Sequence, residues 1–412
     1  MASLSVALVV LVAAAGDAFA SPATPQQLSS RQVPEQAQVI DWKSFNVLPT
    51  VLPPTQANGS AFFFIPPGLS LESMKDKPFH IFDDEFYDVL GPNPTLTLIA
   101  SSGNELLFHE ATTWYPPTDE VFFAQNAGAP ADGTGLNKSN VVSKISLREA
   151  AAVSTQRNAT GSVTVQTLDT PEIINSNGAT NFRGQIVVTT EGQGDDKTSR
   201  LVLMNPVEPY NSTVLVNNFF GRQFNSLNDV SVNPRNKEIY FTDTLYGYLQ
   251  DFRPVPGLRN QVYRYNYDTG AIAAVADGFS LPNGITFSPD GLHAYVTDTG
   301  ASHGFWGWNF TNPMSVYRFD VAEDGSFGNR NLFAYVDSGV PDGIHCDSKG
   351  NVWTGCGDGV QVFNPSGKLI GKVFLGKTSA NFNFAGDGRM VICAEDELYY
   401  ATLAASGGGY IS

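Results

Sequence analysis

The 412-residue sequence is poor in cysteine, histidine and charged residues, and most of its charges are negative. It has three cysteines and five histidines, and Asp, Glu, Lys and Arg together make up 16% of the chain. The 40 acidic residues outnumber the 24 basic ones, which gives a net charge of −16, and no run of basic residues occurs. Because binding to nucleic acid or to an anionic membrane needs clustered positive charge, we expect neither partner.

The three cysteines, Cys346, Cys356 and Cys393, exclude some chemistry and leave one question open. Their spacing is not that of zinc ligands and no activating base lies near them, so neither a zinc site nor a cysteine nucleophile is expected. No serine-hydrolase site is predicted either. An oxidising compartment would allow one disulfide and one free thiol, whereas the alternative is three buried thiols acting as small apolar side chains.

Long apolar segments are missing after the N-terminus, so no transmembrane helix is expected. Residues Ser5–Gly16 form a short apolar stretch, and Ala18-Phe19-Ala20 matches the pattern of a signal-peptide cleavage site. We therefore expect a signal peptide at residues 1–20 and a secreted, extracellular protein; the alternative is a buried N-terminal segment. Five Asn-x-Ser/Thr sequons predict glycosylation at Asn58, Asn137, Asn158, Asn211 and Asn309.

One sequence pattern, clearest from Leu281 to Asp298, recurs along the chain. It consists of an Asn-Gly pair, an alternating apolar strand, a Pro-Asp-Gly turn and a second strand that ends in Thr-Asp. Further copies begin at Leu227, at Pro341 and, more weakly, near His109, Asn177 and Asn381. Each of the six units has room for a four-stranded antiparallel sheet, and no segment of helical period competes. The sequence therefore predicts an all-β, six-bladed β-propeller.

The propeller is expected to occupy residues 81–412. Residues 21–80 are rich in Pro, Gln and Ser and lack the repeat, so they predict an irregular N-terminal extension that lies on or beside the propeller. The run Thr95–Ala100 is expected to add the outer strand that completes the last blade, because such closure removes exposed sheet edges.

The residues that open the repeats predict a metal site. In a propeller the first strand of each blade lines the central channel, so equivalent positions converge at one mouth. These positions hold Glu110, Asn228, Asn283 and Asp342. Two close carboxylates repel unless a cation neutralises them, and oxygen ligands without His or Cys favour calcium. The alternative is that Asn-Gly and Asp-Gly are ordinary turn residues.

Loops after the second strands are expected to wall a pocket over the metal, suited to a small organic ring. The candidate pocket residues are His109, Asn177, Tyr246, Phe305, Trp306 and Trp308. The alternative is a lid that packs on its own blade. The strand register places Asp243 and Asp298 at the rim of the same mouth. It places Asp290, Asp347 and Asp387 on the opposite face and gives His345 a structural role.

Four motifs follow one another in the repeats: Asn225-Ser-Leu-Asn-Asp-Val, Tyr240-Phe-Thr-Asp-Thr-Leu-Tyr-Gly, Leu281-Pro-Asn-Gly-Ile with Ser-Pro-Asp-Gly, and Val340-Pro-Asp-Gly-Ile. They resemble those of the senescence marker protein/gluconolactonase family, and most of all those of its secreted fungal lactonohydrolases, over about residues 105–405. The resemblance implies a six-bladed propeller with one catalytic Ca²⁺ on Glu110, Asn228, Asn283 and Asp342. Where some members have an Arg that binds a sugar lactone, this chain has Ser226, so strict sugar-lactone specificity is not implied.

The resemblance implies calcium-dependent hydrolysis of a lactone, a small cyclic ester, to its hydroxy acid. The metal would polarise the carbonyl, and a carboxylate would assist the attacking water. Asp342 and Glu110 are the candidate catalytic residues. Two alternatives use the same site: hydrolysis of a phosphotriester, and a non-catalytic, calcium-stabilised propeller that binds a ligand. The sequence specifies neither the lactone nor the oligomeric state.

Overall fold

The structure is a computed structural model. The described residues are 31–52, 63–155, 163–386 and 388–408. The predicted signal peptide, the sequons at Asn58 and Asn158, and Asp387 lie outside them.

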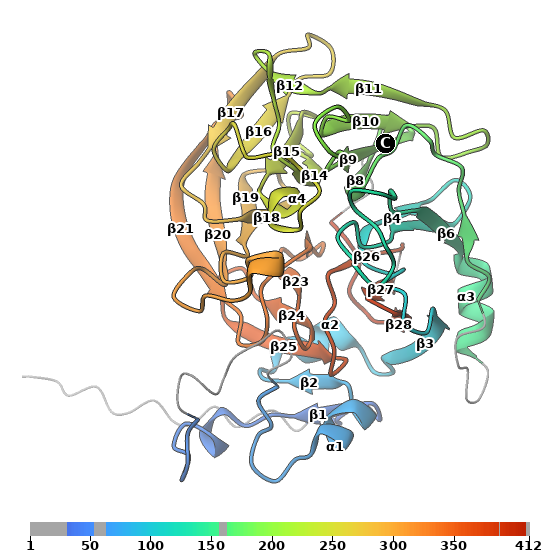
Figure 1. The fold of residues 1–412 in the computed structure, drawn as a ribbon. Helices are drawn as coiled ribbons and strands as arrows, with labels where there is room; N and C mark the ends of the chain where they lie inside the picture. The colour runs from blue at the N-terminus through green and yellow to red at the C-terminus, as the bar shows by residue number, and fades with distance from the viewer. Residues whose placement is uncertain (1–30, 53–62, 156–162, 387, 409–412) are drawn as a thin grey trace, which may run out of the picture. The chain divides into compact units, whose positions relative to one another are not determined.

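Six antiparallel sheets form the blades of a β-propeller, and in each sheet the strands run outward from the inner strand (Figure 1). Blade 1 contains β4 (Glu110–Tyr115), β5 (Glu120–Ala124), β6 (Val142–Ser146) and β7 (Gln166–Thr167). Blade 2 contains β8 (Ser176–Phe182), β9 (Gln185–Thr190), β10 (Arg200–Met204) and β11 (Ser212–Val216). Blade 3 contains β14 (Leu227–Val232), β15 (Ile239–Asp243), β16 (Gln261–Tyr265) and β17 (Ile272–Ala276).

The remaining blades follow in chain order, and a small hairpin of β12 (Asn218–Phe219) and β13 (Arg222–Gln223) precedes blade 3. Blade 4 contains β18 (Pro282–Phe287), β19 (His293–Asp298), β20 (Ser315–Val321) and β21 (Phe327–Tyr335). Blade 5 contains β22 (Ile344–Cys346), β23 (Val352–Cys356), β24 (Gly359–Phe363) and β25 (Leu369–Phe374). Blade 6 contains β26 (Asn381–Phe384), β27 (Arg389–Ala394), β28 (Glu397–Thr402) and β3 (Thr95–Ser101). The predicted six-bladed propeller is confirmed.

The ring closes with a strand from the N-terminal side of the chain. β3 pairs with β28 in a register that runs from Thr95 opposite Thr402 to Ser101 opposite Glu397, which confirms the outer strand predicted at Thr95–Ala100. Each inner strand contacts the next, and β26 contacts β4. Because the six inner strands surround one axis, the residues that open them are brought to one end of a common channel.

The N-terminal extension is more regular than its composition indicates. β2 (Phe79–Ile81) pairs with β25 and β1 (Ala37–Val39) pairs with β2, so blade 5 has six strands. The extension also contains η1 (Trp42–Ser44) and α1 (Leu71–Asp76), and α2 (Glu85–Leu90) follows it. Each strand is three residues long, too short for a period-two pattern to mark it in the sequence.

The expectation that no helix competes with the strands was wrong for one segment. α3 (Leu147–Ser154) lies between β6 and β7, and Ser146 caps it by accepting a hydrogen bond from the Glu149 amide. Its apolar residues are buried with those of β3 and β28. α4 (Tyr246–Leu249) and η2 (Gly304–Trp306) are single turns. In the described part of the chain, no helix has the length and apolar character needed to cross a membrane.

Cys346, Cys356 and Cys393 are free and buried, so the structure favours the alternative of three apolar thiols over a disulfide. Burial raises the pKa of the Cys393 thiol to about 12, which leaves it protonated. The described sequon residues are exposed: Asn137, Asn211 and Asn309.

His80 generates a prediction about the attachment of the extension. Its side chain is 1% exposed, its Nε2 lies 3.1 Å from the Met74 carbonyl, and its ring stacks on Phe374 at 5.0 Å. Burial lowers its pKa from 6.5 to about 4. Between pH 6.5 and pH 4, His80 is protonated in the unfolded chain but stays neutral in the folded chain. The contribution of neutral His80 to the free energy of unfolding is therefore fully present above pH 6.5. It is lost as the pH falls towards 4, by up to about 3 kcal/mol.

Urea unfolding at pH 7 and at pH 4.5 measures this contribution. The control variant His80→Gln has no titrating group and is expected to lose less stability over the same interval. An equal loss in both proteins would contradict a role for His80.

Candidate active site and metal centre

The four candidate metal ligands come from four blades and line one cavity of about 240 Å³. Glu110 opens β4, Asn228 and Asn283 are the second residues of β14 and β18, and Asp342 lies two residues before β22. The Asn283 and Glu110 side chains are within hydrogen-bonding reach of Asp342. The structure therefore brings together side chains that are more than 200 residues apart in the sequence.

The glycines after two of these ligands are explained by close packing and not by turns. Asn283 and Gly284 lie inside β18, where a Cβ atom on Gly284 would overlap the carbonyl oxygen of Asp342. A Cβ atom on Gly343 would meet the Ala380 carbonyl at 2.8 Å. The interpretation of Asn283-Gly284 and Asp342-Gly343 as ordinary turn residues is therefore wrong. The inner strands approach one another so closely at the level of the ligands that only glycine fits.

The carboxyl groups of Glu110 and Asp342 are buried close together. Burial, then the negative charges of Asp342 and Asp229, raise the pKa of Glu110 well above its usual range. Burial raises the pKa of Asp342 to about 6, Glu395 adds to the rise and a positive charge on His109 opposes it. Without a cation, the two groups can be held in contact only if they retain a proton.

Several oxygen atoms in this cavity have no hydrogen-bond partner in the described structure. Asn177 Oδ1, Asn228 Oδ1 and Asp342 Oδ1 are buried and unsatisfied. A buried acceptor without a partner is costly, and a cation that binds all three would remove that cost. Amide and carboxylate oxygens without His or Cys suit a hard divalent ion.

The described residues contain no group of three or more His, Cys, Asp or Glu side chains placed to hold a metal. The candidate set has only two residues of those types, and its other members are amides. A calcium ion accepts amide oxygens, so the donor set of this cavity fits calcium better than a transition metal.

Beside the candidate ligands, His109 forms an ion pair that the sequence did not reveal. His109 Nδ1 lies 3.0 Å from Glu395 Oε2, and the Asn126 amide lies 3.1 Å from Nε2. Burial lowers the pKa of His109, but Glu395, with smaller contributions from Asp342 and Glu191, raises it, and the net shift is upward. His109 therefore carries a positive charge more readily than an isolated histidine. Glu395 follows the second strand of blade 6, and this position was its only sequence signal.

Glu191 is a second acidic residue that sequence reasoning missed. It is 2% exposed, accepts hydrogen bonds from Ser226 Oγ at 2.6 Å and Asn177 Nδ2 at 3.2 Å, and lines the cavity. Burial raises its pKa to about 7. It follows β9 in the sequence Thr-Thr-Glu, as Glu395 follows β27, so its place in the repeat was the available signal.

Asp243 and Asp298 were expected at the rim of the channel mouth, but their side chains are buried and bind backbone amides of their own blades. Asp243 accepts hydrogen bonds from the amides of Asn225 and Ser226, at 3.1 and 2.9 Å. Asp298 accepts equivalent bonds from Ser280 and Leu281, at 2.9 and 2.8 Å. Each carboxylate therefore holds the segment that leads into the inner strand of its own blade, and both side chains are fully buried.

Only four of the six predicted pocket residues line the cavity. His109, Asn177, Tyr246 and Trp308 line the cavity. Phe305 and Trp306 do not, and they are 47% and 59% exposed. They belong to η2, which turns outward, and Trp306 packs edge-on against Tyr248 with ring centroids 5.3 Å apart. The composition of a loop does not show which of its aromatic side chains turn inward.

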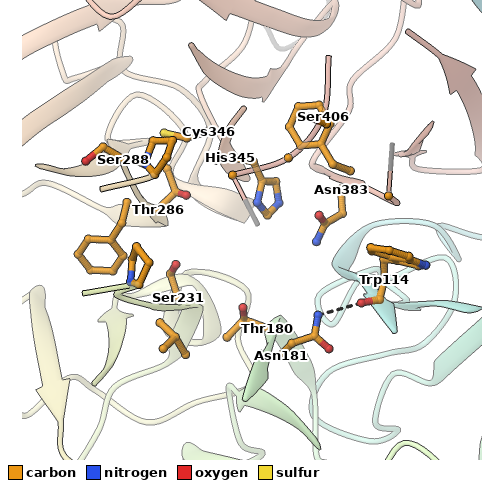
Figure 2. Close-up of a pocket in the computed structure, with 18 of the residues that line it drawn as sticks. Trp114, Thr180, Asn181, Ser231, Thr286, Ser288, His345, Cys346, Asn383 and Ser406 are labelled. Carbon is orange, nitrogen blue, oxygen red and sulfur yellow. Dashed lines mark hydrogen bonds between the residues drawn. The ribbon is translucent and has the colours of Figure 1, made fainter. Parts of the chain in front are cut away.

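A larger cavity of about 730 Å³ lies at the other end of the channel (Figure 2). His345 and Cys346 line it, with hydroxyl and amide groups such as Thr286 and Asn383. His345 therefore lies away from the candidate metal centre, and burial lowers its pKa to about 4. Asp290 and Asp347 stabilise hairpins on this side, where Asp347 accepts hydrogen bonds from Asn351 and Trp353.

The segment Gly300-Ala-Ser-His-Gly304 matches the Gly-x-Ser-x-Gly pattern of serine hydrolases, although no serine-hydrolase site was predicted. Ser302 lines the smaller cavity. The segment follows β19 and leads into the three-residue η2, whereas a nucleophile elbow leads into an α-helix. His303 Nε2 is bonded to Asn312, and no bond between Ser302 and a histidine occurs among the described residues. The match therefore lacks the context of a serine nucleophile.

Comparison with known proteins gives a consistent result. The model of the SMP-30/Gluconolactonase/LRE-like region matches residues 149–395. Lactonohydrolase oryL of Aspergillus oryzae is 27% identical over 317 residues, which are 72% of this chain and 67% of that protein.

Two solved structures share the fold. The structure of a gluconolactonase from Xanthomonas campestris has a TM-score of 0.60 at 23% identity and covers 79% of this chain and 94% of its own. That of regucalcin, a calcium-binding protein from Agrobacterium tumefaciens, has a TM-score of 0.52 at 16% identity and covers 76% of this chain and 98% of its own. The family match covers more than half of the chain and includes three of the four candidate ligands. The chain belongs to the SMP-30/gluconolactonase/LRE-like family.

Proposed function

We propose that the protein is a secreted lactonase that uses one calcium ion to hydrolyse a small cyclic ester. The observation that carries this proposal is the convergence of unsatisfied oxygens from Asn177, Asn228 and Asp342 around the buried Glu110. Lactone hydrolysis is supported by the family match and by the likeness to a lactonohydrolase and a gluconolactonase. Export rests on the signal peptide expected at residues 1–20.

Glu110, Asn228, Asn283 and Asp342 would hold the ion. When bound, calcium would supply Lewis-acid polarisation of the ester carbonyl and balance the two carboxylate charges. Asn177, whose amide nitrogen is held by Glu191, directs its free oxygen to the same cavity. It is placed to orient either the ion or the substrate.

Asp342 is assigned to accept the proton of the attacking water. Burial raises its pKa to about 6 in the absence of a cation, and a bound calcium ion would lower this pKa, so Asp342 would be ionised and able to accept a proton at neutral pH. The positive charge of His109 keeps Asp342 ionised, because it opposes the rise in the pKa. Glu395 and Asn126 fix the His109 ring in that position.

The cavity sets limits on the substrate. A volume of about 240 Å³ accommodates a small ring, and Tyr246 and Trp308 supply apolar wall. Ser226 is not free to bind substrate, because its hydroxyl donates to Glu191 and accepts from the Gly247 amide. Recognition of the substrate therefore rests on the hydroxyl, amide and aromatic groups of the wall.

Hydrolysis of lactones can be followed by proton release in a pH-stat. The panel contains sugar-derived, pantoyl-type and long-chain lactones, and at least one is expected to be hydrolysed. Chelation is expected to abolish the activity and added calcium to restore it, because the carboxylate pair needs the cation. If no lactone is hydrolysed although calcium raises the melting temperature, the phosphotriesterase or the binding module is favoured instead.

Asp342→Asn tests the catalytic assignment. Loss of the proton acceptor is expected to lower turnover by about 10²–10⁴-fold, and loss of one ligand charge to weaken calcium binding. Asp290→Asn is the matched control, since Asp290 also precedes a glycine but lies on the opposite face. Circular dichroism checks that both variants fold. Normal turnover of Asp342→Asn would show that Asp342 is not the proton acceptor.

A further inference from the structure

A third cavity, of about 510 Å³, lies between the N-terminal extension and the outer strands of blade 5. No residue lines both this cavity and the candidate active site. Its extension side is built from residues before position 149, where the family match begins. Its volume is in the range of sites that bind small organic molecules. It is therefore a separate candidate binding site, built jointly by this chain's own extension and the propeller.

Aromatic side chains cluster on the extension side of this cavity. Trp42 contacts Phe82 and Phe45, with ring centroids 5.1 and 5.5 Å apart, and Phe45 contacts Phe64 at 5.2 Å. Trp42 is nevertheless 42% exposed, so the extension alone does not bury it. An apolar occupant would bury the exposed part of this ring.

The floor of the cavity is charged. Lys372, 5% exposed, is held by Asp337 at 2.7 Å and by Asp358 at 2.8 Å. Gln361 donates to both carboxylates, at 2.7 and 3.1 Å. The pKa of His80, which also lines the cavity, is lowered by burial to about 4, so His80 is neutral near pH 7.

The balance of these charges selects the kind of ligand. Two carboxylates against one ammonium leave the floor with one net negative charge. The side chain of Asp337 is 49% exposed, so it can accept a further hydrogen bond. Aromatic faces next to a negative charge attract a cation that carries an apolar group. An anion would meet both the ring faces and the excess carboxylate.

We propose that this cavity binds an apolar organic cation, an amine that bears an aromatic or alkyl group. The ammonium group would bind at Asp337 while the apolar group packs on Trp42 and its neighbours. The site is distinct from the candidate active site, since the two cavities share no lining residue.

Isothermal titration calorimetry of the full chain in saturating calcium tests this proposal. The three probes each carry a phenyl group on a short alkyl chain and differ in charge. 2-Phenylethylammonium is expected to bind about tenfold more tightly than 2-phenylethanol. The anion 3-phenylpropionate is expected not to bind. Equal binding of the ammonium and the alcohol, or no binding of the ammonium, would overturn the proposal.

Variants locate the binding site. Trp42→Ala is expected to weaken binding of the ammonium by about tenfold, and Asp337→Asn to reduce it to that of the alcohol. Phe220→Ala, which removes an aromatic ring that is 85% exposed on a distant hairpin, is the control and is expected to bind normally. Binding that survives Trp42→Ala but is lost in Asp342→Asn would place the probe in the acidic active-site cavity and overturn the proposal.

Discussion

The contact between the buried carboxyl groups of Glu110 and Asp342 is the constraint on which the functional centre depends. Burial penalises both charges, and the charge of Asp342 raises the pKa of Glu110 further, whereas a hydrogen bond from Glu110 lowers the pKa of Asp342. Neutralisation by a proton leaves the unsatisfied oxygens of Asn177 and Asn228 without partners. Neutralisation by a divalent cation would solve both problems at once, which supports the proposed metal centre.

That contact is maintained by the closure of the ring. β3 completes blade 6, β26 contacts β4, and the inner strands are pressed so close that glycine is required at positions 284 and 343. Asp243 and Asp298 then fix the entry to two inner strands through backbone hydrogen bonds. The proposed metal ligands thus lie on or next to rigid strands, while the wall of the cavity comes largely from loops. This division lets the loops determine the substrate without disturbing the ligands.

The parts of the structure that repeat could be predicted from the sequence. Asn228 and Asn283 occupy the same place in their repeats, so their convergence followed from the register alone. The outer strand at Thr95–Ala100 could be predicted because ring closure needs one.

Several features outside the repeat could not be predicted. β1 and β2 are too short to show a pattern, and Glu395 contacts His109 only because blades 6 and 1 are neighbours in the closed ring. The orientation of Trp306 depends on the path of its loop, and amino-acid composition does not encode that path.

A crystal structure of the protein grown with calcium tests the central claim most directly. The account predicts one ion at the mouth of the channel, bound by Glu110, Asn228, Asn283 and Asp342, with at least one water ligand that faces the cavity. An ion enclosed entirely by protein oxygens would leave no place for a substrate and would contradict the catalytic role. A structure with no ion among these four side chains would contradict the metal centre itself.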